Sequence, residues 1–171
     1  GGSSVGGSVE ADQALPFINY CTIRHSASKG ISYLNGSLKV HNSTISQNSG
    51  NGIAISENVN SPTTPTYSVS LVNNTVTENS YTGISIYKVE GQTGNVTIDN
   101  NTVTGNGGNG IYATLYPSGD LTITNSTINS NGEAGIYIGH AAFTVTNNEI
   151  TSNERGITVV NGSGSPNVIS G

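Results

Sequence analysis

The ten carboxylates of this chain are its first candidates for chemistry, and they are scattered through the sequence. Glycoside cleavage needs two carboxylates that act as acid and base, or a carboxylate-bound calcium ion beside a basic residue. Here Asp99 and Glu149 lie in different segments, Glu57 and Glu90 lie in insertions, and no predicted strand carries two aspartates. We therefore predict no catalytic residues.

One group of charged side chains does fall at equivalent positions. Glu133 and Glu154 lie two residues before Gly135 and Gly156, and Arg155 follows the second glutamate. We expect the two carboxylates to lie near each other, where they would suit a weak calcium site, an acidic sugar or an acid–base pair. The alternative is a solvated ion pair that contributes little energy. Calcium is the one cofactor that this cluster leaves open, and no other is expected.

These positions belong to a pattern that occurs six times with a period of 21 to 31 residues. Each copy holds two apolar residues five apart: Ile18/Ile23, Val40/Ile45, Leu71/Val76, Ile98/Val103, Ile123/Ile128 and Val145/Ile150. A glycine and then an isoleucine follow, at Gly30, Gly52, Gly83, Gly110, Gly135 and Gly156. Asparagine recurs in two columns, at Asn42, Asn73, Asn100, Asn125 and Asn147 and at Asn48, Asn79, Asn106, Asn131 and Asn153. Repeats of this length are typical of a solenoid, whose stacked units share one core.

The pattern within each copy indicates the type of solenoid. A Val-x-Ile run, a lone Val or Ile, and a Gly-Ile-x-apolar run are too short for helices and are separated by Asn or Gly. In this respect residues 16–171 resemble the right-handed parallel β-helix repeat family, whose pectate-lyase-like fold also occurs in polygalacturonases, phage tailspikes and surface-protein repeats. We predict an all-β, right-handed parallel β-helix of six to seven coils with three short strands per coil. The resemblance also implies an extracellular or cell-surface location, although no signal peptide is present.

The ends of the chain give the predicted domain limits. Residues 1–13 begin with GGSSVGG and are either a flexible linker or a degenerate first coil. Residues 14–171 form the predicted β-helix domain. Because a solenoid without a polar cap leaves backbone and apolar groups open, we expect a fragment of a longer chain, or another subunit covering an end.

Composition excludes several function classes. A net charge of −5 with only five Lys and Arg argues against a nucleic-acid partner, which needs a basic stripe. No apolar stretch is long enough for membrane insertion. The single cysteine, Cys21, aligns with small turn residues and is expected to be buried. His25, His41 and His140 show no metal-ligand spacing.

The repeat also predicts which strand residues face solvent. The residue after each Gly-Ile should point outward, which gives a column about 4.8 Å apart that contains Ser32, Ala54, Ser85, Tyr112, Tyr137 and Thr158. Tyr87 lies two residues farther along its strand and Tyr116 lies near the following loop. Tyrosine rings pack on sugar rings while their hydroxyls hydrogen-bond, so this strip would suit a polysaccharide. The alternative is structural, because tyrosine favours strands and packs on itself.

Insertions and threonines add two further expectations. The longer insertions, residues 56–67, 88–94 and 116–119, all follow the Gly-Ile strand, so they should project from one edge, which is often the binding face of repeat proteins. Threonines flank the lone apolar residue at Thr22, Thr44, Thr75/Thr77, Thr102/Thr104, Thr127 and Thr151. Regular Thr-x-Thr arrays resemble those of ice-binding proteins, although solvent-facing strand positions favour threonine in any case.

The asparagine columns are best explained as structural. Stacked Asn side chains hydrogen-bond to each other and to nearby backbone, which satisfies polar groups in tight bends. Taken together, the sequence predicts a non-catalytic extracellular module that binds a polysaccharide or acts as a spacer. Two alternatives stay open, a degenerate or partial polysaccharide lyase or hydrolase and an ice-binding protein.

Overall fold

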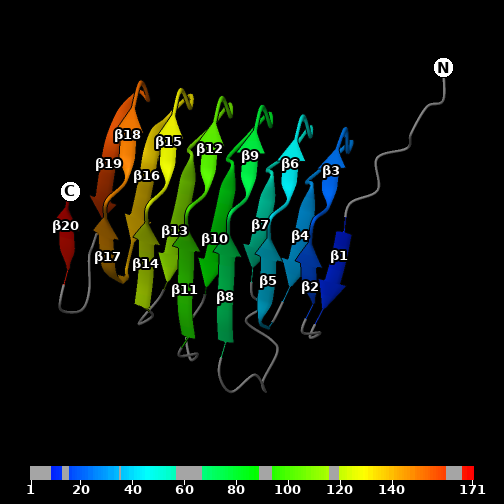
Figure 1. Ribbon diagram of the computed structural model, residues 1–171, viewed down its shortest axis with the longest axis horizontal. Helices are drawn as coiled ribbons and strands as arrows, with labels where there is room; N and C mark the ends of the chain where they lie inside the picture. Colours follow the sequence, from blue (N-terminus) through cyan, green and yellow to red (C-terminus); the bar gives the residue numbers. More distant parts are fainter. Residues whose placement is uncertain are drawn as a thin grey trace.

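The computed structural model describes residues 9–12, 16–34, 36–56, 67–88, 94–115, 120–160 and 167–171. These residues form twenty β-strands, and none of them lies in a helix. The strands stack into three parallel sheets that run side by side along the molecule (Figure 1). No helix in the described part of the chain has the length and hydropathy needed to cross a membrane.

Each sheet collects one strand from every coil. The first sheet contains β1 (Val9–Asp12), β4 (Ile31–Leu34), β7 (Ile53–Ser56), β10 (Ile84–Lys88), β13 (Ile111–Leu115), β16 (Ala134–Gly139) and β19 (Arg155–Val160). The second contains β2 (Phe17–Asn19), β5 (Leu38–His41), β8 (Tyr67–Val72), β11 (Gly94–Asp99), β14 (Asp120–Thr124), β17 (Ala142–Thr146) and β20 (Val168–Ser170). The third contains β3 (Thr22–Arg24), β6 (Thr44–Ser46), β9 (Thr75–Thr77), β12 (Thr102–Thr104), β15 (Thr127–Asn129) and β18 (Glu149–Thr151).

This arrangement confirms the predicted parallel solenoid with three short strands per coil. The coil count differs slightly from the predicted six to seven. The third sheet has six described strands, so the chain makes five full turns from β3 to β18, with part-coils on either side. At the start of the chain, residues 9–12 form β1 and pair with β4, whereas residues 1–8 and 13 lie outside the described residues.

The core consists of the apolar residues that the repeat identifies. Ile98, Val103 and Ile111 of one coil have no exposed surface. Val103 pairs with Val76 in the coil before it and with Ile128 in the coil after it, so like residues stack on like. Stiff β-branched side chains pack well on such pleated surfaces, and the stack gives one continuous core.

A sharp turn joins each second-sheet strand to the next third-sheet strand. Its first residue is left-handed, with φ between 50° and 57°, at Tyr20, Asn42, Asn73, Asn100, Asn125 and Asn147. Asparagine tolerates this conformation better than other non-glycine residues, because its short polar side chain can bond locally. The first asparagine column therefore exists because the bend requires it.

The second asparagine column is buried and forms a ladder inside the coils. Asn48, Asn79, Asn106 and Asn131 each donate from Nδ2 to Oδ1 of the next asparagine, at 2.8, 3.0, 3.0 and 2.9 Å. The same oxygens accept backbone N–H groups, as when Asn79 N donates to Asn106 Oδ1 at 3.1 Å. The predicted structural role of the asparagines is confirmed.

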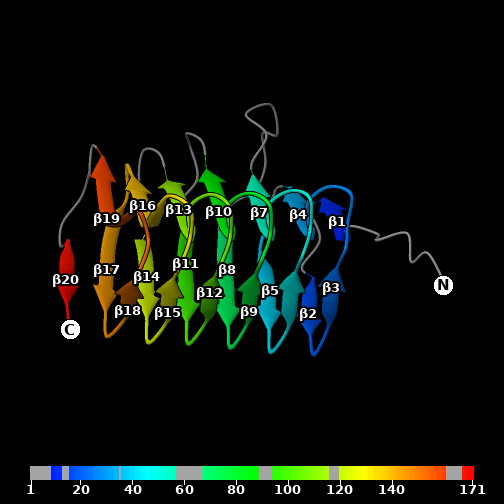
Figure 2. The same cartoon turned by 90° about the horizontal axis from the view of Figure 1, so that it is seen from above.

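The sequence predicts that the longer insertions project from one edge of the molecule. These insertions are the connections β7–β8, β10–β11 and β13–β14. All three join a first-sheet strand to the next second-sheet strand, so their ends lie on one edge (Figure 2). Most of the insertions themselves, residues 57–66, 89–93 and 116–119, lie outside the described residues.

The expectation that Cys21 is buried is wrong. Its thiol is free and exposed, although the equivalent Ser43 and Asn74 are buried. Among the described strands, β2 and β3 are the edges of their sheets, so no described strand lies beside this turn on one side. The turn still bonds to the next coil, where Cys21 N donates to Ser43 Oγ at 3.1 Å.

Candidate functional site

The outer face of the first sheet carries the predicted tyrosine column. The register pairs Ser85 with Tyr112, Tyr112 with Tyr137, and Tyr137 with Thr158. The rings of Tyr112 and Tyr137 are stacked, with centroids 4.8 Å apart and planes 12° apart. Each ring covers one face of the other, so both rings are held in a fixed orientation and both remain half-buried.

The stacked pair lies next to a strip of small side chains. In the three coils before Tyr112, the same column holds Ser85, Ala54 and Ser32. Ala54 is only 6% exposed, so the prediction that it faces solvent is wrong. Ser85, which pairs with Tyr112 on that side, is much smaller than a tyrosine ring.

Tyr87 borders the same strip. It lies on β10 opposite Thr114, two residues beyond Ser85, which makes it a diagonal neighbour of Tyr112. Its side chain is 49% exposed. The structure therefore brings Tyr87, Tyr112 and Tyr137 onto one face, which we call the tyrosine surface. Tyr116, the fourth predicted member, lies outside the described residues.

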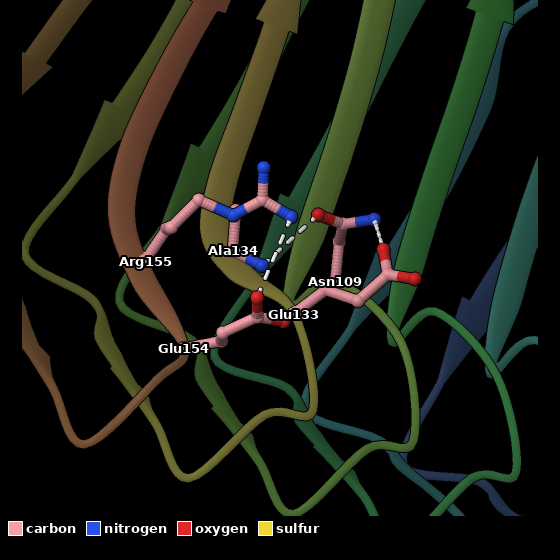
Figure 3. A network of polar contacts seen from close by, with 5 residues as sticks. All are labelled: Asn109, Glu133, Ala134, Glu154 and Arg155. Carbon is pink, nitrogen blue, oxygen red and sulfur yellow. Dashed lines mark hydrogen bonds and ion pairs between the residues drawn. The ribbon is translucent and has the colours of Figure 1, made fainter.

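The predicted charged cluster lies in the turns before β16 and β19, and Figure 3 shows its side chains. The turns adjoin, because Arg155 N donates to Glu133 O at 3.3 Å. The Glu133 carboxylate nevertheless accepts from Asn109 Nδ2 of the preceding coil, at 2.5 Å. Glu154 instead lies 4.0 Å from its own neighbour Arg155, and both side chains are about 60% exposed.

The two glutamates thus use different partners. Asn109 also accepts from Ala134 N at 3.2 Å. The side chain of Asn109 therefore bonds twice to the turn of the next coil, once to Ala134 N and once to the Glu133 carboxylate. An exposed pair such as Glu154–Arg155 contributes little energy. Among the described residues, no group of three or more His, Cys, Asp or Glu side chains is placed to hold a metal ion.

The third sheet presents the threonine array. One outward column runs Thr22, Thr44, Thr75, Thr102, Thr127 and Glu149 in exact register. The other runs Arg24, Ser46, Thr77, Thr104, Asn129 and Thr151. Four threonines on β9 and β12 form a regular block. The first column continues with Thr44 and Thr127, whereas Ser46 and Asn129 interrupt the second column on either side.

A further group of residues lies on the second sheet and was not predicted from the sequence. Pro16, Phe17, Ser37, Lys39, His41 and Ser68 line a cavity of about 520 Å³ at the outer face of β2, β5 and β8. A smaller cavity of about 260 Å³ lies over β14 and β17, with Asp120, Thr122 and Thr144 in its lining. The repeat gave no signal for either cavity, because outward residues do not follow the core pattern.

The comparisons with known proteins agree with this architecture. No curated protein and no solved structure matches the chain significantly. The family model described as "right handed beta helix region" matches residues 8–170. That match spans all three sheets and nearly all of the chain, so the protein belongs to the right-handed β-helix family.

Proposed function

We propose that this β-helix is a non-catalytic module that binds a polysaccharide on the tyrosine surface. The observation that supports this function is the stacked Tyr112–Tyr137 pair beside the strip of Ser85, Ala54 and Ser32. A sugar ring placed over Ser85 would continue the stack on the face of Tyr112 that is turned away from Tyr137. Tyr87 would contact the same sugar ring from the side.

The chemistry of the surface suits a neutral or weakly polar glycan. Aromatic rings supply apolar contact to the C–H faces of sugars, and tyrosine and serine hydroxyls supply hydrogen bonds. Both tyrosines are held by each other, so binding would cost little additional side-chain ordering.

Affinity-gel electrophoresis and a glycan array, run with and without calcium, test this proposal. We expect the Tyr112→Ala/Tyr137→Ala variant to lose about tenfold in affinity, since each aromatic contact is worth about 0.5–1.5 kcal/mol. Tyr81→Ala is the matched control, because Tyr81 is 64% exposed and lies away from the tyrosine surface in the turn before β10. Equal binding by the wild type and the double variant would refute the tyrosine site, and no binding to any glycan would leave a spacer role.

A second candidate function, ice binding, is favoured by one specific observation. Thr75, Thr77, Thr102 and Thr104 form a block of four in register on adjacent strands. The spacing is about 4.8 Å between strands and about 6.6 Å along each strand, which gives a two-dimensional lattice of hydroxyl and methyl groups. The Thr104 hydroxyl bonds to Asn129 Oδ1, so the lattice is interrupted at that side.

Ice-recrystallisation and thermal-hysteresis assays test this second function. We expect Thr75→Tyr/Thr102→Tyr to abolish any activity, because the bulky rings would lift the surface off a crystal face. Thr97→Tyr/Thr122→Tyr is the matched control, since these outward threonines pair on the second sheet. A wild-type protein that leaves ice growth unchanged would exclude the function.

We also propose that the module works outside the cell as part of a larger polypeptide. The support is the fold family and the low content of charged residues, 9%. The test is fractionation of the source cells with an antibody against the module. Recovery in the cytosol would contradict the location, and a band at the size of residues 1–171 alone would contradict the larger polypeptide.

A further inference from the structure

The charges of the chain are unevenly distributed. Residues 13–56 contain Arg24, Lys29 and Lys39 and no acidic residue, whereas the rest of the chain has two basic and ten acidic residues. The first group carries +3 and the second carries −8, which together give the net −5. The segment that contains β2 to β7 is therefore basic in an acidic protein, although β1, which carries Glu10 and Asp12, pairs with β4. A basic segment attracts anions.

The larger cavity lies within this basic region. Its volume of about 520 Å³ falls in the range typical of small-molecule sites, about 300–1,000 Å³. Phe17 contributes an aromatic ring that is 57% exposed, and Lys39, its register partner on β5, contributes an exposed ammonium group. The only salt bridge among the described residues is that of Arg155 with Glu154, so no described carboxylate neutralises Lys39.

Contacts around the cavity hold its walls in place. The Phe17 and His41 rings meet edge to face, with centroids 5.2 Å apart and planes at 79°. His41 Nε2 lies 2.9 Å from Ser70 Oγ, in hydrogen-bonding distance. Lys39 N donates to Pro16 O at 3.1 Å, and Ser68 N donates to Ser37 Oγ at 3.0 Å. These bonds connect β2, β5 and β8, which lie side by side (Figure 1).

We propose that this cavity binds a six-membered ring that carries a carboxylate. The ring would pack against Phe17, and the carboxylate would pair with the Lys39 ammonium group. The Ser37 and Ser68 hydroxyls would bond to the remaining polar groups of the ligand. The site lies on a different sheet from the tyrosine surface and does not depend on the function proposed for it.

Binding of two ring carboxylates tests the site and distinguishes the possible sources of its ligand. Benzoate represents aromatic acids and glucuronate represents sugar acids, while benzyl alcohol and glucose are their uncharged counterparts. NMR titration of the full chain at millimolar ligand should give saturable shifts at Phe17 and His41 for at least one carboxylate. We expect Lys39→Gln to weaken that binding about tenfold, as for loss of a hydrogen bond to a charged group.

The control variants separate a built site from general attraction. Arg24→Gln removes the same charge from the same basic region, but Arg24 lies on the third sheet and outside the cavity lining. We expect Arg24→Gln to retain binding and Phe17→Ala to weaken it, while all three variants keep the wild-type melting temperature within a few degrees. Binding by benzoate alone or by glucuronate alone identifies the source and supports the site.

Three results would overturn the proposal. One is that neither carboxylate shifts the cavity resonances. Another is that the uncharged rings bind as tightly as the carboxylates. The third is that Arg24→Gln weakens binding as much as Lys39→Gln does, because the effect would then be long-range electrostatics rather than a contact.

Discussion

Asn106 shows how much one side chain contributes inside a coil. Only 2% of it is exposed, and its Nδ2 donates to Asn131 Oδ1, Val76 O and Thr104 O at 3.0, 3.1 and 3.3 Å. Its Oδ1 accepts from both nitrogens of Asn79, at 3.0 and 3.1 Å. The amide therefore bonds to backbone groups of both the bend and the preceding coil, and burial makes such groups costly to leave unpaired.

We predict that Asn106→Ala lowers the free energy of unfolding by about 3 kcal/mol or more, because several buried polar groups lose their partners together. Asn100→Ala is the matched control. Asn100 belongs to the exposed column and donates to Asn73 Oδ1 at 2.7 Å. It has φ 53°, so alanine there should cost about 1 kcal/mol, mainly from the left-handed backbone. Urea denaturation measures both variants, and similar losses would contradict the special role of the buried column.

The same residues indicate how far side-chain detail could be predicted. The two asparagine columns were evident because the bends that need them recur in every coil. The partner of Glu133 was not evident, because Asn109 lies 24 residues earlier, in the preceding coil. Phe17, Lys39 and His41 could not be grouped either, because cavity-lining residues are outward and unique to their coils.

The strands depend on glycine at the start of the first-sheet segment. An added Cβ at Gly110 would lie 2.7 Å from Gly135 O, 2.7 Å from Ile128 Cγ2 and 2.8 Å from Asn131 Nδ2. Two of these neighbours are backbone and core atoms that cannot move away freely. The glycine column is therefore explained by close approach of consecutive coils at the asparagine ladder.

We predict that Gly110→Ala lowers the free energy of unfolding by about 1–3 kcal/mol through overpacking. Gly156→Ala is the paired control. It should change the free energy of unfolding by less than about 1 kcal/mol, because a Cβ there would meet nothing within 4 Å. Thermal melts followed by circular dichroism compare the two. A Gly110 variant as stable as the wild type would show that neighbouring coils can separate without cost.

Strand positions were predictable to the extent that they carry core residues. The pair Ile98 and Val103 and the glycine that follows specify where each strand lies, because a stacked coil repeats the same inward side chains. The residues between them say little about where a strand lies. The function of an outward threonine or tyrosine depends on the side chains beside it, which come from other coils. The fold was therefore predictable in detail, whereas the candidate sites were predictable only where a column repeats.

Stability along the whole solenoid should fall toward the ends of the described stack. Ile98 and Ile123 of the central coils are completely buried, whereas Ile169, which takes the equivalent place on β20, is 56% exposed. Each coil contacts mainly its neighbours, so local stability reflects the number of neighbours.

Hydrogen exchange followed by mass spectrometry measures this gradient. We predict that amides of β11 and β14 exchange more slowly than those of β20, since β11 and β14 are paired on both sides whereas β20 pairs only with β17 among the described strands. The comparison stays within the second sheet, so strand type and turn chemistry are matched. Uniform protection along the sheet would instead indicate that the solenoid opens only as one cooperative unit.

The buried asparagine ladder has a direction. Every bond between two side chains of the ladder, from Asn48 to Asn131, runs from Nδ2 to the Oδ1 of the following coil. The same Nδ2 groups also donate to backbone oxygens of the preceding coil. The side-chain amides are therefore aligned dipoles, and one end of the ladder offers acceptors while the other offers donors. Two such solenoids meeting end to end could continue the ladder only head to tail. A two-fold axis would bring like ends together, so any filament that extends this core must be polar.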